Sequence, residues 1–192
     1  WWVDEELKMI KAKGYEDIYP EMYAASKRFQ FNCWKTAFEA MRSSELLGGF
    51  HFLQLADTDV YENSNGIIDC FDDENATPSD KFLQFNGDKV ILIDLKKRNF
   101  ISGQVLGFKI KLSNLGKTDC KTADLRYNLT GEKNVVYASG GMKNLDVSEN
   151  GLLTLCKARI LLPQVQSSER LTLKIALDGE NGVYAENEWN IW

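Results

Sequence analysis

The residues whose types could carry out chemistry gather around Asp57. This acid closes a short apolar run at 49–55 that is preceded by a glycine pair, and a loop rich in Asp, Glu, Tyr and Asn follows it. In a βα-barrel, residues at the carboxyl end of a strand face the active site. Planar polar groups, together with the aromatic face of Tyr61, could bind a carbohydrate. The candidate substrate-binding residues are therefore Gln54, Asp57, Asp59, Tyr61 and Asn63.

Each of these candidates also has a purely structural interpretation. Asp57 could cap the loop that follows it. The side chain of Gln54 could be satisfied by a polar network in the core, because a polar residue inside an apolar strand must find partners. The loop from Thr58 to Asn65 could be a solvated turn. The residues alone leave both interpretations open.

Histidine and cysteine give little chemistry here. His51 is the only histidine, and no serine or cysteine nucleophile motif lies near it, so a catalytic triad is not supported. Its place between two phenylalanines indicates a core or strand-edge residue. The four cysteines form no C-x-x-C pair, and we expect free thiols. Cys33 and Cys156 stand in apolar patterns, which predicts that both are buried.

The acids at 69, 72, 73 and 74 are interpreted as a solvated turn, with a surface calcium ion as the alternative. A calcium-binding EF-hand loop is discounted, because Tyr61 would stand at its first ligand position. We expect no metal site and no cofactor.

Composition excludes several classes of partner. The 192 residues include 44% hydrophobic and 27% charged types, which is ordinary for a globular protein, and the net charge is −5. The only basic cluster, at 96–98, does not indicate nucleic acid or an anionic membrane surface. No apolar run approaches the ~20 residues that are needed to cross a bilayer.

Residues 1 to about 86 show the apolar spacing of helices. One helix is expected to end at Gly14, a second to run from 15 to about 28 with an irregularity at Pro20, and a third to begin at an N-cap on Asn32. The third has the clearest apolar stripe. The sequence Thr-Pro-Ser-Asp at 77–80 is typical of a helix start. Between these helices, the run 49–55 predicts a buried strand.

From residue 88 onward the apolar period becomes two. Turn-forming residues separate the apolar segments, as expected for antiparallel strands. About seven strands in such a length is the count of an immunoglobulin-like sandwich. The expected strands lie at 89–95, 108–112, 125–129, 134–139, 152–160, 171–177 and 183–192.

A string of spaced residues carries a resemblance to a known family. These residues are Trp34-Lys35, Glu39, Arg42 and Ser43-Ser44, then Gly49–His51 and Leu53–Asp57, then Asn65–Asp72, and last Pro78, Phe82 and Phe85. Their order resembles the end of the catalytic barrel in bacterial glycoside hydrolases of family two, the β-galactosidase and β-glucuronidase group. The stretch 185–192 looks like the last strand of the sandwich that follows the barrel in these proteins. At 59–64 the chain departs from the glycine-rich loop of many relatives.

The resemblance implies an α+β chain with two domains. Residues 1–87 would be the carboxy-terminal portion of a βα-barrel, mostly helical and with the closing strand, and residues 88–192 an immunoglobulin-like antiparallel β-sandwich. The parent would be a retaining β-glycosidase that acts on carbohydrate in the bacterial periplasm or outside the cell. Its two catalytic glutamates would lie upstream. The chain's early glutamates stand in helical patterns, so we expect no catalytic residue here and an inactive isolated chain.

A second interpretation is a non-catalytic sandwich module that binds carbohydrate or protein. A planar aromatic platform on a sandwich face would favour it, and Trp189 and Trp192 are the residues that could form one, although their place on the last strand favours the core. Both faces of the run 49–55 are apolar. We therefore expect either self-association through residues 48–57 or a collapse of the helices over this segment.

Overall fold

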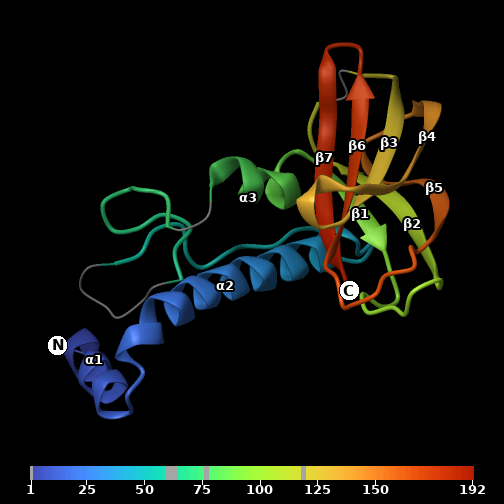
Figure 1. Cartoon of the computed structure of the whole chain (residues 1–192). Helices are drawn as coiled ribbons and strands as arrows, with labels where there is room; N and C mark the ends of the chain where they lie inside the picture. The colour runs from blue at the N-terminus through green and yellow to red at the C-terminus, as the bar shows by residue number, and fades with distance from the viewer. Residues whose placement is uncertain (1, 59–64, 76–77, 118–119) are drawn as a thin grey trace. The chain divides into compact units, whose positions relative to one another are not determined.

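The computed structural model describes residues 2–58, 65–75, 78–117 and 120–192 (Figure 1). The chain divides into two compact units. The helix–loop unit consists of Trp1–Met41 and Leu47–Phe82, and the sandwich unit consists of Arg42–Leu46 and Leu83–Trp192. Each unit is described by itself.

The sandwich unit contains two antiparallel sheets, which hold the seven strands of the described residues. One sheet has the order β1-β2-β5 and the other the order β4-β3-β6-β7. Figure 1 shows the last two strands of the chain, β6 and β7, side by side. The strands are β1 Lys89–Asp94, β2 Val105–Asn114, β3 Thr122–Thr130, β4 Val136–Asp146, β5 Gly151–Leu161, β6 Leu171–Gly179 and β7 Gly182–Ile191.

Alternation along the strands builds a single core between the two sheets. In β7, residues 185, 187, 189 and 191 are buried while their neighbours are not. Opposite them in the register, Leu173 of β6 pairs with Trp189, and both side chains are buried. Burying a large apolar side chain contributes roughly 1.5–3 kcal/mol, so this continuous cluster is the main source of stability. Six of the seven strands lie close to their predicted positions, whereas β4 begins two residues after the start of the strand predicted at 134–139 and continues to Asp146. The expected arrangement of two antiparallel sheets in a sandwich is confirmed.

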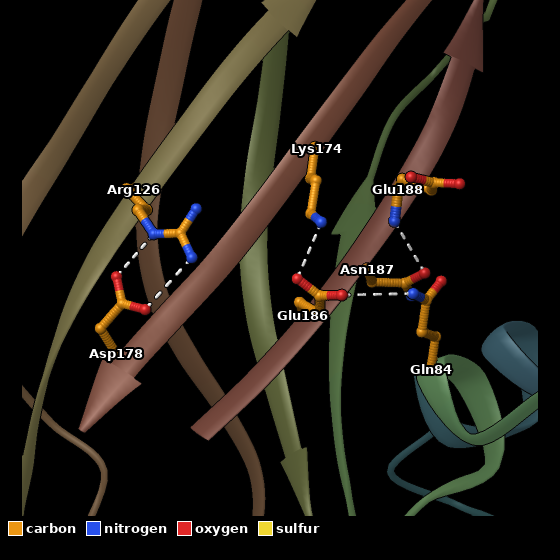
Figure 2. Close-up of polar contacts among 7 residues, drawn as sticks. All are labelled: Gln84, Arg126, Lys174, Asp178, Glu186, Asn187 and Glu188. Carbon is orange, nitrogen blue, oxygen red and sulfur yellow. Dashed lines mark hydrogen bonds and ion pairs between the residues drawn. The ribbon is translucent and has the colours of Figure 1, made fainter. Parts of the chain in front are cut away.

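Among the buried polar residues of the sandwich unit, Asn187 connects the two sheets. Asn187 of β7 is fully buried, and its Nδ2 donates to the backbone oxygen of Ile91 in β1 at 2.8 Å. Its Oδ1 accepts the N–H of Glu188 at 2.9 Å (Figure 2). A buried amide with both ends hydrogen-bonded costs little, and here it connects one sheet to the other.

The outer face of the four-stranded sheet is covered by paired charges. Arg126 of β3 contacts Asp178 of β6 with Nε–Oδ2 at 2.6 Å, and Lys174 of β6 contacts Glu186 of β7 at 2.9 Å (Figure 2). The carboxylate of Asp178 raises the pKa of Arg126 through this hydrogen bond. Such partly exposed pairs stabilise a sheet only slightly.

The helix–loop unit begins with α1, Trp2–Ala12, and a 3₁₀ turn at Glu16–Ile18. Gly14 separates them with φ +73°, as a helix-ending glycine does. Next comes α2, Tyr19–Arg42, a continuous helix of 24 residues. The prediction of two helices here is wrong: Pro20 lies in the first turn, where proline is tolerated, and nothing from 21 to 42 is Gly or Pro. Asn32 is therefore no N-cap, and its carbonyl oxygen accepts from Thr36 Oγ1 within the helix.

An aromatic cluster holds the loop of this unit against α2. The ring of Phe38 lies 4.8 Å from that of Phe50 and 5.4 Å from that of Phe52, measured between centroids. Trp34 contacts Phe52 edge-on at 5.7 Å. Phe82, in the first half of α3 (Ser79–Asn86), contacts Phe38 as well. The apolar stripe of α2 therefore contacts Phe50 and Phe52 of the run 49–55, although Phe52 is only half-buried and Phe50 is 39% exposed.

The strand predicted at 49–55 is absent from the structure, and the described residues contain no barrel. The run forms no ladder, and the isolated bridges that follow it join Ala56 to Ile68 and Ile68 to Glu74. A strand exists only through a ladder with its neighbours, and in the described part of this unit only the carbonyl of Leu55, at the end of the run, accepts such backbone hydrogen bonds, from Ile67 and Ile68. His51 is exposed rather than part of a core. Leu53 and Leu55 are 78% and 65% exposed.

Two further sequence expectations concern single residue types. All four cysteines are free, but Cys33 is exposed on α2, contrary to its predicted burial. Cys156 is half-buried in β5, and burial raises the pKa of its thiol. Among the described residues, no helix is long and apolar enough to cross a membrane.

Candidate functional site

The carboxylate of Asp57 fastens the base of the Asp57 loop, which we define as residues 57–75. Its Oδ1 accepts the backbone N–H of Gly66 at 2.6 Å, and its Oδ2 accepts from the side-chain Nδ2 of Asn75 at 2.6 Å. Both oxygens are therefore engaged by groups that are 9 and 18 residues away in the sequence. Charge-assisted hydrogen bonds of this length are about twice as strong as neutral ones.

Backbone hydrogen bonds repeat this closure. The N–H groups of Ile67 and Ile68 donate to the carbonyl of Leu55 at 2.9 and 3.0 Å. In return, the N–H of Asp57 donates to the carbonyl of Ile68 at 3.0 Å. Gly66 is buried at this crossing, and a Cβ added to it would lie 2.4 Å from the Asp57 nitrogen and 2.5 Å from the Ile68 oxygen. Only glycine permits so close an approach of two backbones.

Asn75 is the second polar anchor of the loop. Besides the bond to Asp57, its Nδ2 lies 3.3 Å from the carbonyl oxygen of Gly66, and its Oδ1 accepts from Lys27 Nζ of α2 at 3.0 Å. The chain Lys27–Asn75–Asp57–Gly66 thus runs from the helix to the base of the loop. Asp57 is half-buried, so the residue is partly accessible to solvent.

The remaining predicted site residues fall into two groups. Gln54 is half-buried, and its Nε2 has no hydrogen-bond partner among the described residues. Asp59, Tyr61 and Asn63 lie outside the described residues. The substrate-binding role of all five stays a prediction.

Sequence reasoning missed the two partners of Asp57. Asn75 stood in a polar stretch between the loop and the next helix, where nothing in its spacing tied it to a residue 18 positions earlier. Gly66 follows an asparagine, which marks a turn, but its pairing with Asp57 depends on the fold of the loop.

The acids later in the loop have structural tasks. Asp69 Oδ1 accepts the N–H groups of Phe71 and Asp73 at 2.8 and 3.0 Å, which makes a tight turn. Glu74 Oε1 accepts the N–H of Ser79 at 2.9 Å, at the start of α3. Within the described ranges, no group of three or more His, Cys, Asp or Glu side chains is placed to hold a metal ion.

A second candidate site lies in the sandwich unit. A cavity of about 730 Å³ is lined by the segments 99–102 and 162–169 and by the end of β7. Trp192 lines it and is 55% exposed, whereas Trp189 is 1% exposed and belongs to the core. The backbone of Trp192 fixes the first segment, because its N–H donates to Arg98 at 2.7 Å and its carbonyl accepts from Phe100 at 2.5 Å.

Part of the chain matches a protein-family model. Residues 104–192, which include β2 to β7, match a family model described as "Domain of unknown function (DUF8488)". None of the curated proteins matches this chain in sequence.

Comparison with solved structures gives weak likenesses to β-sandwiches. A putative β-galactosidase from Bacteroides fragilis shares 17% identity at a TM-score of 0.39, over 52% of this chain and 15% of that chain. A β-glucuronidase from Parabacteroides merdae shares 16% at 0.37, over 54% and 13%. The CARDB domain of the PF1109 protein from Pyrococcus furiosus shares 12% at 0.39, over 54% and 90%. The match thus spans only a small part of the two glycosidases, and likenesses this weak support no argument about function.

Proposed function

We propose that this chain is the carboxy-terminal part of a retaining β-glycosidase of the family-two type. In this proposal the Asp57 loop supplies part of the wall of the sugar pocket, and the sandwich is a supporting domain. In the proposed parent, the run 49–55, which has no ladder among the described residues, would pair with upstream barrel strands that carry the two catalytic glutamates. The ordered series of residues between Trp34 and Phe85, followed at once by the sandwich, supports this assignment.

The single observation that carries the proposed role is the double anchoring of Asp57. By holding Gly66 and Asn75, the carboxylate fixes both ends of the polar stretch between them. A binding loop needs such a fixed base, because a loop that is ordered before binding loses little conformational entropy when the ligand binds.

The carboxylate keeps capacity for a ligand despite these bonds. An ionised carboxylate offers about four lone-pair sites. Two are occupied by the Gly66 N–H and the Asn75 amide. The others can accept hydrogen bonds from sugar hydroxyls, so one side chain both positions the loop and contacts substrate.

The experiment is turnover of nitrophenyl β-galactoside and β-glucuronide by the polypeptide that contains this segment and its upstream barrel. Asp57→Ala should raise KM and lower kcat/KM at least tenfold, since it removes a sugar contact and frees the loop. Asp73→Ala, an exposed acid of the same loop, is the matched control and should leave both constants unchanged. An active polypeptide with an unaltered KM after Asp57→Ala would contradict the role, and a polypeptide without glycosidase activity would contradict the assignment.

A second function, that of a carbohydrate-binding sandwich module, is favoured by the exposed Trp192. An indole face beside the amides of Asn99 and Gln166 is the kind of surface on which a sugar ring can stack. Quenching of tryptophan fluorescence by neutral oligosaccharides, abolished in Trp192→Ala, would support this function. Unchanged fluorescence at millimolar sugar would exclude it.

A further inference from the structure

A groove on the three-stranded sheet gathers positive charge on an otherwise acidic chain. Its volume is about 460 Å³, and it lies entirely within the sandwich unit. The net charge of the chain is −5. The charged residues that line this cationic groove are five cations and one carboxylate, Lys96, Lys97, Lys109, Lys157, Arg159 and Asp94.

The strand register places these cations against one another. Lys109 of β2 stands directly opposite Lys157 of β5, and Gly107 stands opposite Arg159. Like charges in a cross-strand pair are destabilising, and among the residues that line the groove only the carboxylate of Asp94, opposite Lys109 in β1, offsets this repulsion. An anion between the two ammonium groups would remove this cost. The register therefore favours a site for an anion over a merely solvated face.

Gly107 leaves the floor of the groove open. A Cβ at this position would meet no described atom within 4 Å. Beside it, Val105 pairs with Leu161 across the same two strands, and both side chains are exposed. The groove thus offers bare backbone and an aliphatic pair next to a row of cations.

Asp94 gives the groove a second chemical property. Its Oδ2 lies 3.8 Å from Lys109 Nζ, and the side chain is 57% exposed. A carboxylate repels a pure polyanion but accepts hydrogen bonds from hydroxyl groups. A ligand that suits both Asp94 and the cations therefore carries hydroxyl donors as well as negative groups.

We propose that the cationic groove binds an acidic polysaccharide, with its carboxylate or sulfate groups between Lys109, Lys157 and Arg159. The hydroxyls of the sugar donate to Asp94, and its C–H face lies over Gly107 and the Val105–Leu161 pair. Nucleic acid fits less well, because its phosphate backbone offers Asp94 few donors. This inference does not rest on the proposed glycosidase function.

The test measures binding of the 192-residue chain to sulfated dextran, to polygalacturonate and to neutral dextran of equal length. We expect binding to an anionic polymer that weakens as salt is raised, and none to neutral dextran. Tighter binding of the sulfated or of the carboxylated polymer identifies the anionic group. Single-stranded DNA and vesicles with anionic lipid serve as competing ligands.

Two variants distinguish binding in the cationic groove from nonspecific electrostatic attraction of the polymer to the surface. The double change Lys109→Gln with Lys157→Gln should weaken binding about tenfold or more, because two close charges are lost. Gly107→Leu keeps every charge but fills the floor, and it should weaken binding to a similar extent. The matched control is Lys121→Gln with Lys143→Gln, which removes two exposed cations elsewhere on the sandwich unit.

Three results would overturn the proposal. The first is binding that survives Gly107→Leu, and the second is an equal loss in the control double variant. The third is binding of DNA or vesicles as tight as that of the polysaccharide and equally sensitive to the groove variants. Circular dichroism of each variant confirms its fold, and Arg159→Gln provides an independent change should one of the others fail to fold.

Discussion

The two units use their apolar residues in opposite ways. Among the described residues, the buried hydrophobic side chains of the helix–loop unit are Phe38 and Phe82, whereas the sandwich unit buries a continuous cluster. Alternating strands direct every second side chain to one core, so a short sequence suffices to close it. A long helix with one apolar stripe needs a partner surface, and in its own unit it finds the rings of Phe50 and Phe52.

Polar contacts matter more for the structure of the helix–loop unit than for that of the sandwich unit. The helix–loop unit depends on Asp57 and Asn75 to close its loop. In the sandwich unit the ion pairs lie on the surface, where each is worth about 0–1 kcal/mol. The comparison suggests a division of tasks: the sandwich supplies stability, and the Asp57 loop supplies an accessible polar group in a fixed position.

The largest expected effect is a difference in autonomous folding between the two units. Residues 83–192 expressed alone should fold and unfold cooperatively with about 5–15 kcal/mol of stability, because their core is complete. Residues 1–82 alone should not. Circular dichroism and amide dispersion of both pieces are the measurement. A well-dispersed amino-terminal piece beside a disordered sandwich would reverse this assignment.

A matched pair of leucines measures the difference in burial. Leu173 is fully buried and Leu53 is 78% exposed. Leu173→Ala should lower the free energy of unfolding by about 2–5 kcal/mol, since it leaves a cavity. Leu53→Ala should change it by less than about 0.5 kcal/mol. Urea unfolding of the whole chain checks both values, and equal losses would contradict the described core.

A single methyl group tests the closure of the Asp57 loop. Gly66→Ala places a Cβ against the Asp57 nitrogen and the Ile68 oxygen, so the loop must open, at a cost of about 1–3 kcal/mol. Gly48→Ala is the control, because its Cβ would meet no described atom within 4 Å. Amide exchange should rise at 66–68 and 75 in Gly66→Ala alone. Unchanged exchange there would show that the crossing is looser than described.

The smallest expected effect is self-association. Leu53 and Leu55 are exposed beside each other on the run without a ladder, and such a patch promotes weak pairing of copies. Changing both to Lys should reduce the concentration-dependent rise in light scattering, while Met9→Lys on α1 should not. Scattering that is independent of concentration in the unaltered chain would remove this expectation.

The sandwich was predicted well from the sequence because each strand is specified by the pattern of its own residues. A period of two, interrupted by turn residues, determines both the strands and their inward faces, as in β7. The same reasoning failed at 49–55, where a short apolar run has no period of its own and takes its structure from whatever lies beside it. The prediction of a helix start at Asn32 failed because asparagine is a common N-cap residue but also occurs inside helices. The absence of Gly and Pro from 21 to 42 is what allows α2 to be continuous.

The candidate site was predictable only in part. Asp57 stood out as the acid that ends an apolar run, and the structure shows how it closes the loop. Asn75, Gly66 and Lys27 could not be connected to it from spacing, because they come together through loop closure. Likewise, the five cations of the groove are scattered from 96 to 159, and the register of β2 and β5 brings Lys109, Lys157 and Arg159 together.

Native-state amide exchange of the whole chain, with and without Asp57→Ala, tests the division of tasks most directly. The amides of β2, β3, β6 and β7 should exchange together through global unfolding in both proteins. The amides of Asp57, Gly66, Ile68 and Asn75 should exchange through a smaller local opening, and Asp57→Ala should speed only these. Equal protection of both units, or a loss of protection across the sandwich strands in the variant, would contradict this division of tasks.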